Sequence, residues 1–137
     1  MKHPLSVTIA GWVVLIFTVW NAIRAWTSIA WSGVLAEFSV RMTPETSALI
    51  GAFWTIFGLA ACLGVWLRKK WSAVLLWIVA IGYTVWYWSE RFIFQDPRPN
   101  VPFGVIVNLT LFVIIFFASR SLTREAYERD IESPKTE

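Results

Sequence analysis

The clearest pattern in the sequence is a succession of four apolar runs separated by short polar segments. A helix needs about 20 apolar residues to cross the roughly 30 Å hydrocarbon core of a bilayer, and each run has that length. With their flanking residues, the runs predict transmembrane helices at about 4–26, 44–67, 71–90 and 101–119. The pattern therefore predicts an all-α polytopic membrane protein in which four helices form an antiparallel bundle.

Two other interpretations of these runs are disfavoured. The runs lack the alternation of a barrel strand, and four strands cannot close a barrel. The first run follows Lys2 and resembles the start of a signal peptide, but its apolar stretch is too long and no small-x-small cleavage site follows it. We therefore expect it to be retained as the first helix.

Short polar segments set the ends of the predicted helices. Thr43 is a suitable N-cap, Pro44 suits the first helical position, and Glu45 complements the helix dipole. Residues 68–72 leave room only for a tight turn, which predicts a hairpin of the second and third helices.

The connection between the first two helices contains an amphipathic stretch. Its apolar residues share one helical face, and Glu37 and Arg41 are spaced for an i, i+4 pair. We favour a short helix lying in the membrane interface over a continuation of the first helix that bends across the bundle. The apolar residues of this face are Trp31, Val34, Leu35 and Phe38.

The distribution of lysine and arginine predicts the orientation. Of the 12 basic residues, eight fall on the side of both chain ends and four on the other. The positive-inside rule therefore predicts a multi-pass protein of the bacterial plasma (inner) membrane with both termini in the cytoplasm. Residues 1–119 form the predicted transmembrane domain, and residues 120–137 a charged cytoplasmic tail. The i, i+4 pairs Arg124–Glu128 and Glu125–Arg129 predict that the fourth helix continues a few turns into this tail, up to residues 133–134. The majority comprises Lys2, Arg68, Lys69, Lys70, Arg120, Arg124, Arg129 and Lys135, and the minority Arg24, Arg41, Arg91 and Arg98.

Composition supports this class of protein. Hydrophobic residues make up 57% of the chain, more than a soluble domain of 137 residues can bury in its core. The ten tryptophans suit an aromatic belt at the bilayer interfaces. Although the pI is about 9.4, the basic residues are split among ends and loops, so we expect no binding of nucleic acid.

The second apolar run carries a stripe of small residues on one helical face. Small side chains allow helix backbones to approach closely, and van der Waals contact then holds helices together in lipid. We favour packing inside the bundle; the alternative is a docking face for a partner protein. The stripe consists of Ser47, Gly51, Thr55, Gly58 and Cys62.

Aromatic and polar residues gather toward the predicted outer side. Trp54 and Tyr83 should lie deeper than a belt requires, where they could hold a flat ligand. Arg24 and Arg91 should end their helices at similar depth, so at least one should contact an acid or a bound anion. The candidate ligand-binding residues are Asn21, Arg24, Trp54, Tyr83, Tyr87 and Arg91.

Residues for catalysis or metal binding are scarce. The chain has one histidine, His3, and one cysteine, Cys62, whereas a metal or haem site usually needs several converging ligands. No carboxylate, lysine or histidine is expected at mid-membrane, where a proton-coupled transporter usually has one. We therefore predict no catalytic residues, no metal and no cofactor, and we do not expect an enzyme.

The layout resembles the small four-helix DoxX-like bacterial inner-membrane proteins. The similarity lies in a first helix, an interfacial stretch, a helix that opens with Pro44 and carries Gly58 and Gly64, a basic turn at 68–70 and two further helices. It covers about the first two-thirds of the chain. The acidic residue that such proteins often carry in the second helix is missing, so the resemblance implies a fold and no site residues.

Two functions fit these observations. The first is a non-catalytic accessory, assembly or scaffolding subunit of a larger membrane complex, with the lipid bilayer and other membrane subunits, or a second copy, as partners. The alternative is a carrier or binder of a small lipid-soluble or neutral ligand, such as a quinone, pigment or lipid, at the outer aromatic residues.

Overall fold

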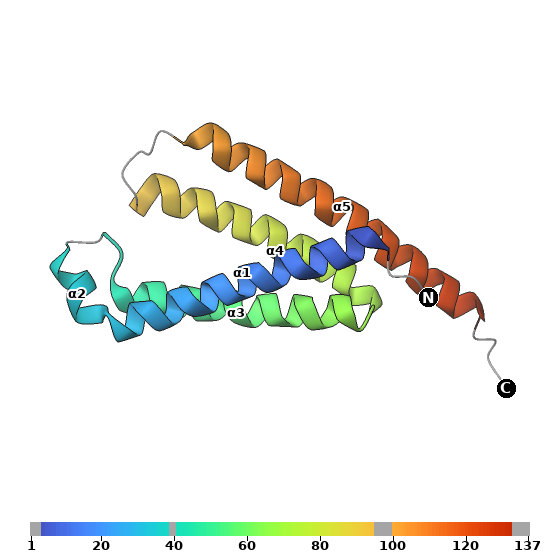
Figure 1. Cartoon of the computed structure of the whole chain (residues 1–137), viewed down its shortest axis with the longest axis horizontal. Helices are drawn as coiled ribbons and strands as arrows, with labels where there is room; N and C mark the ends of the chain where they lie inside the picture. Colours follow the sequence, from blue (N-terminus) through green and yellow to red (C-terminus); the bar gives the residue numbers. More distant parts are fainter. Residues whose placement is uncertain (1–3, 39–40, 95–99, 133–137) are drawn as a thin grey trace.

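The computed structural model describes residues 4–38, 41–94 and 100–132, and these residues are helical with short connections and contain no strand (Figure 1). Four helices are long and apolar enough to cross a membrane. The chain is therefore an all-helical four-helix membrane bundle, as the apolar runs predict. The elements are α1 (Leu5–Ala30), α2 (Ser32–Glu37), α3 (Pro44–Trp66), α4 (Lys70–Ser89), the π-helical segment η1 (Glu90–Phe94) and α5 (Val101–Glu132).

The four long helices form a ring in which each helix packs against two neighbours. α1 packs against α3 and α5, and α4 packs against the same two helices, so every neighbouring pair is antiparallel (Figure 1). The short helix α2 lies at the end where α1 finishes and α3 starts. We call this the Arg24 end of the bundle, and the opposite end, which holds the turn between α3 and α4, the Arg68 end.

Local signals set the boundaries of α3. The Thr43 hydroxyl accepts a hydrogen bond of 3.3 Å from the backbone N–H of Thr46, and Pro44 follows the cap. At the other end, backbone bonds from Lys69 to Gly64 and from Arg68 to Val65, both 3.2 Å, close a Schellman motif. Arg68 occupies the position that favours glycine, with a φ of 48°.

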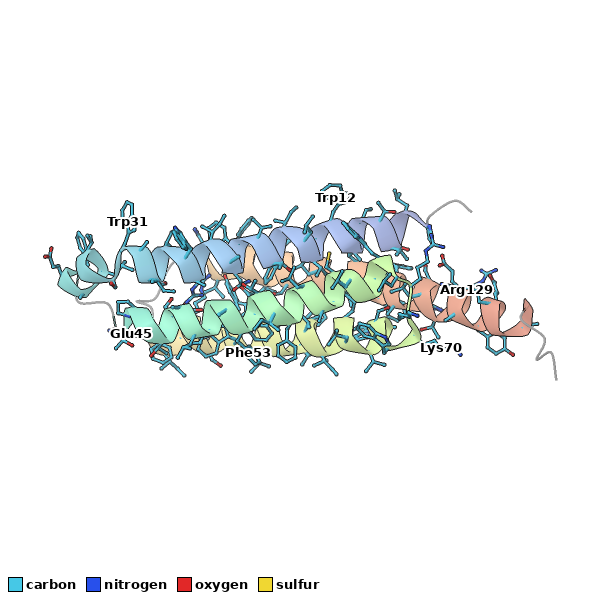
Figure 2. All side chains as sticks on the ribbon, turned by 90° about the horizontal axis from the view of Figure 1, so that it is seen from below. Trp12, Trp31, Glu45, Phe53, Lys70 and Arg129 are labelled. Carbon is cyan, nitrogen blue, oxygen red and sulfur yellow. The ribbon has the colours of Figure 1, made fainter. Side chains whose placement is uncertain are left out.

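The interior is built from small and medium-sized residues. Ala61, Leu76 and Ala118 are almost fully buried, whereas large residues such as Trp12 and Phe53 are exposed on the surface (Figure 2). Small interior residues and a large apolar exterior are expected where lipid is the solvent. Leu122 belongs to the same buried cluster as Leu76, so the core continues beyond residue 119.

α4 continues beyond its predicted end into the π-helical segment η1. α5 runs without a break to Glu132, so the predicted continuation of the fourth helix past residue 119 is confirmed. The expected short helix between the first two spans is present as α2. Some residues used for the prediction lie outside the described residues, namely His3 and three of the basic residues, Lys2, Arg98 and Lys135.

Candidate functional site

An ion pair joins α1 to the start of η1 at the Arg24 end. The Arg24 guanidinium donates in a fork to Glu90, from Nη1 to Oε2 at 2.9 Å and from Nη2 to Oε1 at 2.5 Å. The two side chains are only 24% and 13% exposed. Arg24 Nε also donates to Ser47 Oγ of α3 at 3.3 Å. The expected contact between an arginine and an acid is confirmed, and it ties three helices together.

Arg91 points to a different part of the same end. Its Nη1 donates to the Tyr87 hydroxyl at 2.9 Å, and its guanidinium carbon lies 5.8 Å from the centre of the Trp88 ring. Gly104 of α5 lies beside these groups, since a Cβ there would be 3.3 Å from the Tyr87 hydroxyl and 3.6 Å from Arg91 Nη1. Arg91 therefore lies between α4 and α5, whereas Arg24 lies among α1, α3 and η1.

A buried amide, Asn21, and three aromatic rings lie near the Arg24–Glu90 pair. Asn21 is 1% exposed, and its Nδ2 donates to the Phe17 carbonyl at 2.9 Å. The Tyr83 ring meets Phe17 edge-on at 4.0 Å between centroids and Trp54 at 5.2 Å. Three rings from α1, α3 and α4 are thus in contact with one another.

These rings form one boundary of a cavity at the centre of the bundle. The cavity has a volume of about 60 Å³ and is lined by residues of all four long helices. Its surface is largely apolar, and the lining includes no lysine, arginine, histidine or carboxylate. The polar groups in the lining belong to Thr18, Tyr83, Thr84 and Asn108.

A groove on the lateral surface of the bundle lies next to this cavity. It lies between α1 and the α4–α5 pair, has a volume of about 330 Å³, and includes Trp20, Tyr87 and Gly104. The groove and the cavity share Phe17, Tyr83, Asn108 and Leu111 in their linings. The two spaces are therefore adjacent, with these four side chains between them.

Asn108 lies where the cavity and the groove meet, and its amide is unsatisfied. The Nδ2 atom is buried, yet it has no hydrogen-bond partner in the part of the chain that the structure describes. A buried N–H group without an acceptor costs about 1–3 kcal/mol, so such groups are rare in folded proteins. The donor is available to an acceptor atom that enters the cavity.

The candidate residues chosen from the sequence fall into two groups. Trp54 and Tyr83 line the cavity, and Tyr83 and Tyr87 line the groove. Asn21, Arg24 and Arg91 line neither space. Asn21 donates to the Phe17 carbonyl on its own helix, and the two arginines make the contacts described above.

The sequence choice omitted other residues of the lining. Phe17, Thr18, Thr84 and Asn108 all line the cavity. The three polar ones are recognisable in the sequence as isolated polar residues within apolar runs. Which of them lacks an internal partner depends on how the helices are rotated, and sequence spacing alone does not give this.

The stripe of small residues on α3 faces α1 along much of its length. A Cβ on Gly51 would lie 3.0 Å from Ala25 Cβ and from the Asn21 carbonyl oxygen, and a Cβ on Gly58 would lie 2.2 Å from Thr18 Oγ1. In the same stripe, Ser47 accepts from Arg24 and Ser28, Thr55 donates to the Gly51 carbonyl, and Cys62 is buried.

Within residues 4–38, 41–94 and 100–132, no three histidine, cysteine, aspartate or glutamate side chains are grouped as metal ligands would be. The class of protein that the fold and the site define is a four-helix membrane bundle with a central cavity beside a lateral groove. Comparison with family models, curated proteins and solved structures finds no match to this chain.

Proposed function

We propose that this protein binds a small, neutral, lipid-soluble molecule in the central cavity, with a hydrogen-bond acceptor of the ligand placed against Asn108. The observation that carries the proposal is the buried, unsatisfied Nδ2 of Asn108 at the junction of cavity and lateral groove. A bound acceptor would satisfy this donor, and the groove lies beside the cavity on the lateral surface of the bundle. Binding pockets for small molecules commonly combine apolar walls with a few placed polar groups.

The size of the spaces limits the ligand. About 60 Å³ holds only a group of a few heavy atoms, since one water molecule occupies about 30 Å³ of liquid. The rest of the ligand would lie in the groove of about 330 Å³, beside Phe17 and Tyr83. Because the lining has no charged side chain, a neutral ligand is favoured over an ion. A carbonyl compound with a flat ring, such as a quinone, fits these limits.

The test replaces Asn108 with leucine and measures binding of a short-chain benzoquinone to the full chain in detergent, by thermal shift and tryptophan quenching. Without a ligand, Asn108→Leu should be as stable as wild type or more stable, because an unpaired buried donor is removed. Affinity for the quinone should fall about tenfold, which corresponds to about 1.4 kcal/mol for the lost hydrogen bond.

Thr110→Val is the matched control, because Thr110 is exposed on the same helix and its hydroxyl donates to the Ile106 carbonyl. It should bind the quinone like wild type. An alkylbenzene without a carbonyl should bind wild type and Asn108→Leu alike. Unchanged quinone affinity in Asn108→Leu, or no quinone binding by wild type, contradicts the proposal.

An accessory or assembly role is the second candidate. The small-residue stripe now argues less for it, because α1 already covers Gly51 and Gly58. What supports it is an exposed pair on the charged extension of α5, Tyr127 and Ile131, which are 68% and 65% exposed and lie four residues apart on one helical face. Purification in mild detergent should then yield a stoichiometric partner that Ile131→Glu loses, whereas purification of the chain alone argues against this role.

We also propose that the Arg68 end faces the bacterial cytoplasm. The basic residues Arg68, Lys69 and Lys70 support this orientation. Exposed tryptophans near each end of the spans, such as Trp26 and Trp66, fit aromatic belts at two interfaces. A cysteine introduced at position 2 or 135 should react with a membrane-impermeant reagent only after cells are opened. Reaction in intact cells contradicts the orientation.

A further inference from the structure

A second groove lies between α4 and α5 at the Arg68 end, away from the central cavity. It is open, has a volume of about 660 Å³, and is lined by two kinds of residue. Ala73, Val74, Trp77 and Phe116 give an apolar part, whereas Arg120, Thr123, Arg124 and Tyr127 give a polar and cationic part. None of these residues lines the central cavity or its lateral groove.

The two parts follow one another along the groove. Trp77 Nε1 donates to Ser119 Oγ at 3.1 Å, which fixes the register of the antiparallel helices α4 and α5. From this level, residues 123–127 of α5 extend toward the Arg68 end, and Phe116 lies in the direction of the bundle centre. The groove therefore changes from cationic to apolar as it runs toward the middle of the membrane.

A third basic residue lies on the face of α4 that lines the groove. Lys70 precedes Ala73, Val74 and Trp77 by three, four and seven residues, a spacing that places all four on one side of a helix. Lys70 is exposed at the start of α4, at the end of the bundle opposite Glu45 (Figure 2). It extends the cationic part of the groove to the end of the helix pair.

Arg120 and Arg124 give the groove lining itself a positive charge, and the structure shows an acidic contact for Arg124. Arg124 Nε donates to Glu128 at 2.8 Å, and these side chains are 82% and 55% exposed. That exposed pair is weak and leaves both groups accessible to water and to other ions. Arg120 is exposed one helical turn closer to the apolar part.

We propose that this groove binds an anionic phospholipid. Its phosphate would lie against Arg120 and Arg124, and one acyl chain would lie along Val74, Trp77 and Phe116. Basic pockets between transmembrane helices commonly bind the headgroups of acidic lipids. The combination of cations at one end and apolar side chains at the other matches a molecule with an anionic head and an apolar tail, and a soluble anion would leave the apolar part exposed.

The experiment compares phosphatidylglycerol with phosphatidylcholine of the same acyl chains. The full chain is purified in mild detergent, titrated with each lipid, and followed by native mass spectrometry and melting temperature. Wild type should retain phosphatidylglycerol preferentially. Arg120→Gln should weaken phosphatidylglycerol binding about fivefold, the effect expected for one basic residue near an anionic surface. Val74→Trp should weaken it as well, by filling the apolar part of the groove.

Arg129→Gln is the matched control. Arg129 lies on the same helix and at the same end (Figure 2), but its Nη2 donates to the Arg68 carbonyl at 3.2 Å. Nine residues separate it from Arg120, which places it on the opposite face of α5. This variant should bind phosphatidylglycerol like wild type.

Several results would overturn the proposal. Equal retention of both lipids by wild type would show that the cations are not used. Equal weakening by Arg120→Gln and Arg129→Gln would indicate diffuse attraction in place of a site. Unchanged binding in Arg120→Gln or in Val74→Trp would exclude the groove. Stabilisation by glycerol phosphate equal to that by phosphatidylglycerol would assign the cations to a soluble phosphate.

Discussion

Replacement of Gly58 by alanine tests how closely α1 and α3 pack. The added Cβ would lie 2.2 Å from Thr18 Oγ1, 3.2 Å from Thr18 Cβ and 3.5 Å from Thr18 Cα. Ordinary contacts between heavy atoms are about 3.5–4.0 Å, so the first of these distances cannot persist. Either the Thr18 side chain rotates or the two helices separate.

Both ways of relieving the contact cost free energy. Rotation of Thr18 gives up the 2.7 Å hydrogen bond from its hydroxyl to the Val14 carbonyl, and helix separation loses packing. Overpacking in a dense interior costs about 1–3 kcal/mol, whereas alanine is favoured over glycine in a helix by up to about 1 kcal/mol. We therefore expect Gly58→Ala to lower the free energy of unfolding by about 1 kcal/mol.

The assay is unfolding in mixed micelles by increasing fractions of a denaturing detergent. Gly33→Ala is the control, because nothing lies within 4 Å of a Cβ at Gly33, and it should leave stability unchanged or slightly raised. In a Thr18→Ala background the Oγ1 atom is absent, so Gly58→Ala should become neutral or stabilising. If Gly58→Ala is as stable as wild type and shows no coupling to Thr18→Ala, the close approach of α1 and α3 is wrong.

Two further predictions concern the ends of the bundle. Arg24→Ala should lower the free energy of unfolding by about 2 kcal/mol, less than for a fully buried pair, because the Glu90 carboxylate, 13% exposed, loses its two hydrogen bonds. The double variant Arg24→Ala, Glu90→Gln should lose less free energy than the sum of the two single variants, and strict additivity in the same unfolding assay contradicts the pairing. Arg68→Gly should relieve a positive φ of 48° but lose the 3.2 Å ion pair with Glu125, so it should lower stability by about 1 kcal/mol less in a Glu125→Gln background than in wild type. An equal effect in both backgrounds contradicts the ion pair.

The parts of the fold that the sequence predicts are those decided by local solubility. Four apolar runs specify four spanning helices because an unpaired backbone is excluded from lipid whatever its neighbours are. The start of α3 follows in the same way from Thr43 and Pro44, which act within one helical turn. The four spans and the N-cap of α3 can therefore be predicted without any tertiary contact.

Other features depend on contacts that spacing does not reveal. Arg68 takes a left-handed conformation without glycine because Glu125 and Arg129 of α5 both contact it. The burial of Leu122 likewise requires α5 to pack beyond the apolar run against the rest of the core. The charge pairs after residue 120 predict that the helix continues, but not that it packs against the core, because neither of these α5 contacts is local.

The site illustrates the same limit. Trp54 and Tyr83 were recognised as candidates because their predicted depth is unusual for belt residues, and both line the cavity. Asn108 was visible as a polar residue in an apolar run, like Asn21. The two asparagines differ in their hydrogen bonds, which depend on how the helices are rotated. Asn21 donates to the Phe17 carbonyl, whereas Asn108 Nδ2 has no partner among the described residues.

The bundle divides stability and binding between two kinds of helix contact. Along α1 and α3, Gly51 brings the two backbones together away from the cavity, because a Cβ there would lie 3.0 Å from the Asn21 carbonyl oxygen. Where this pair meets α4 and α5, the rings of Tyr83 and Phe112 line an open space. Substitutions in the glycine contacts should therefore change the unfolding free energy in the absence of any ligand. Substitutions at Asn108 should change ligand affinity while the empty protein keeps or gains stability, a separation that a purely structural role for the cavity would not produce.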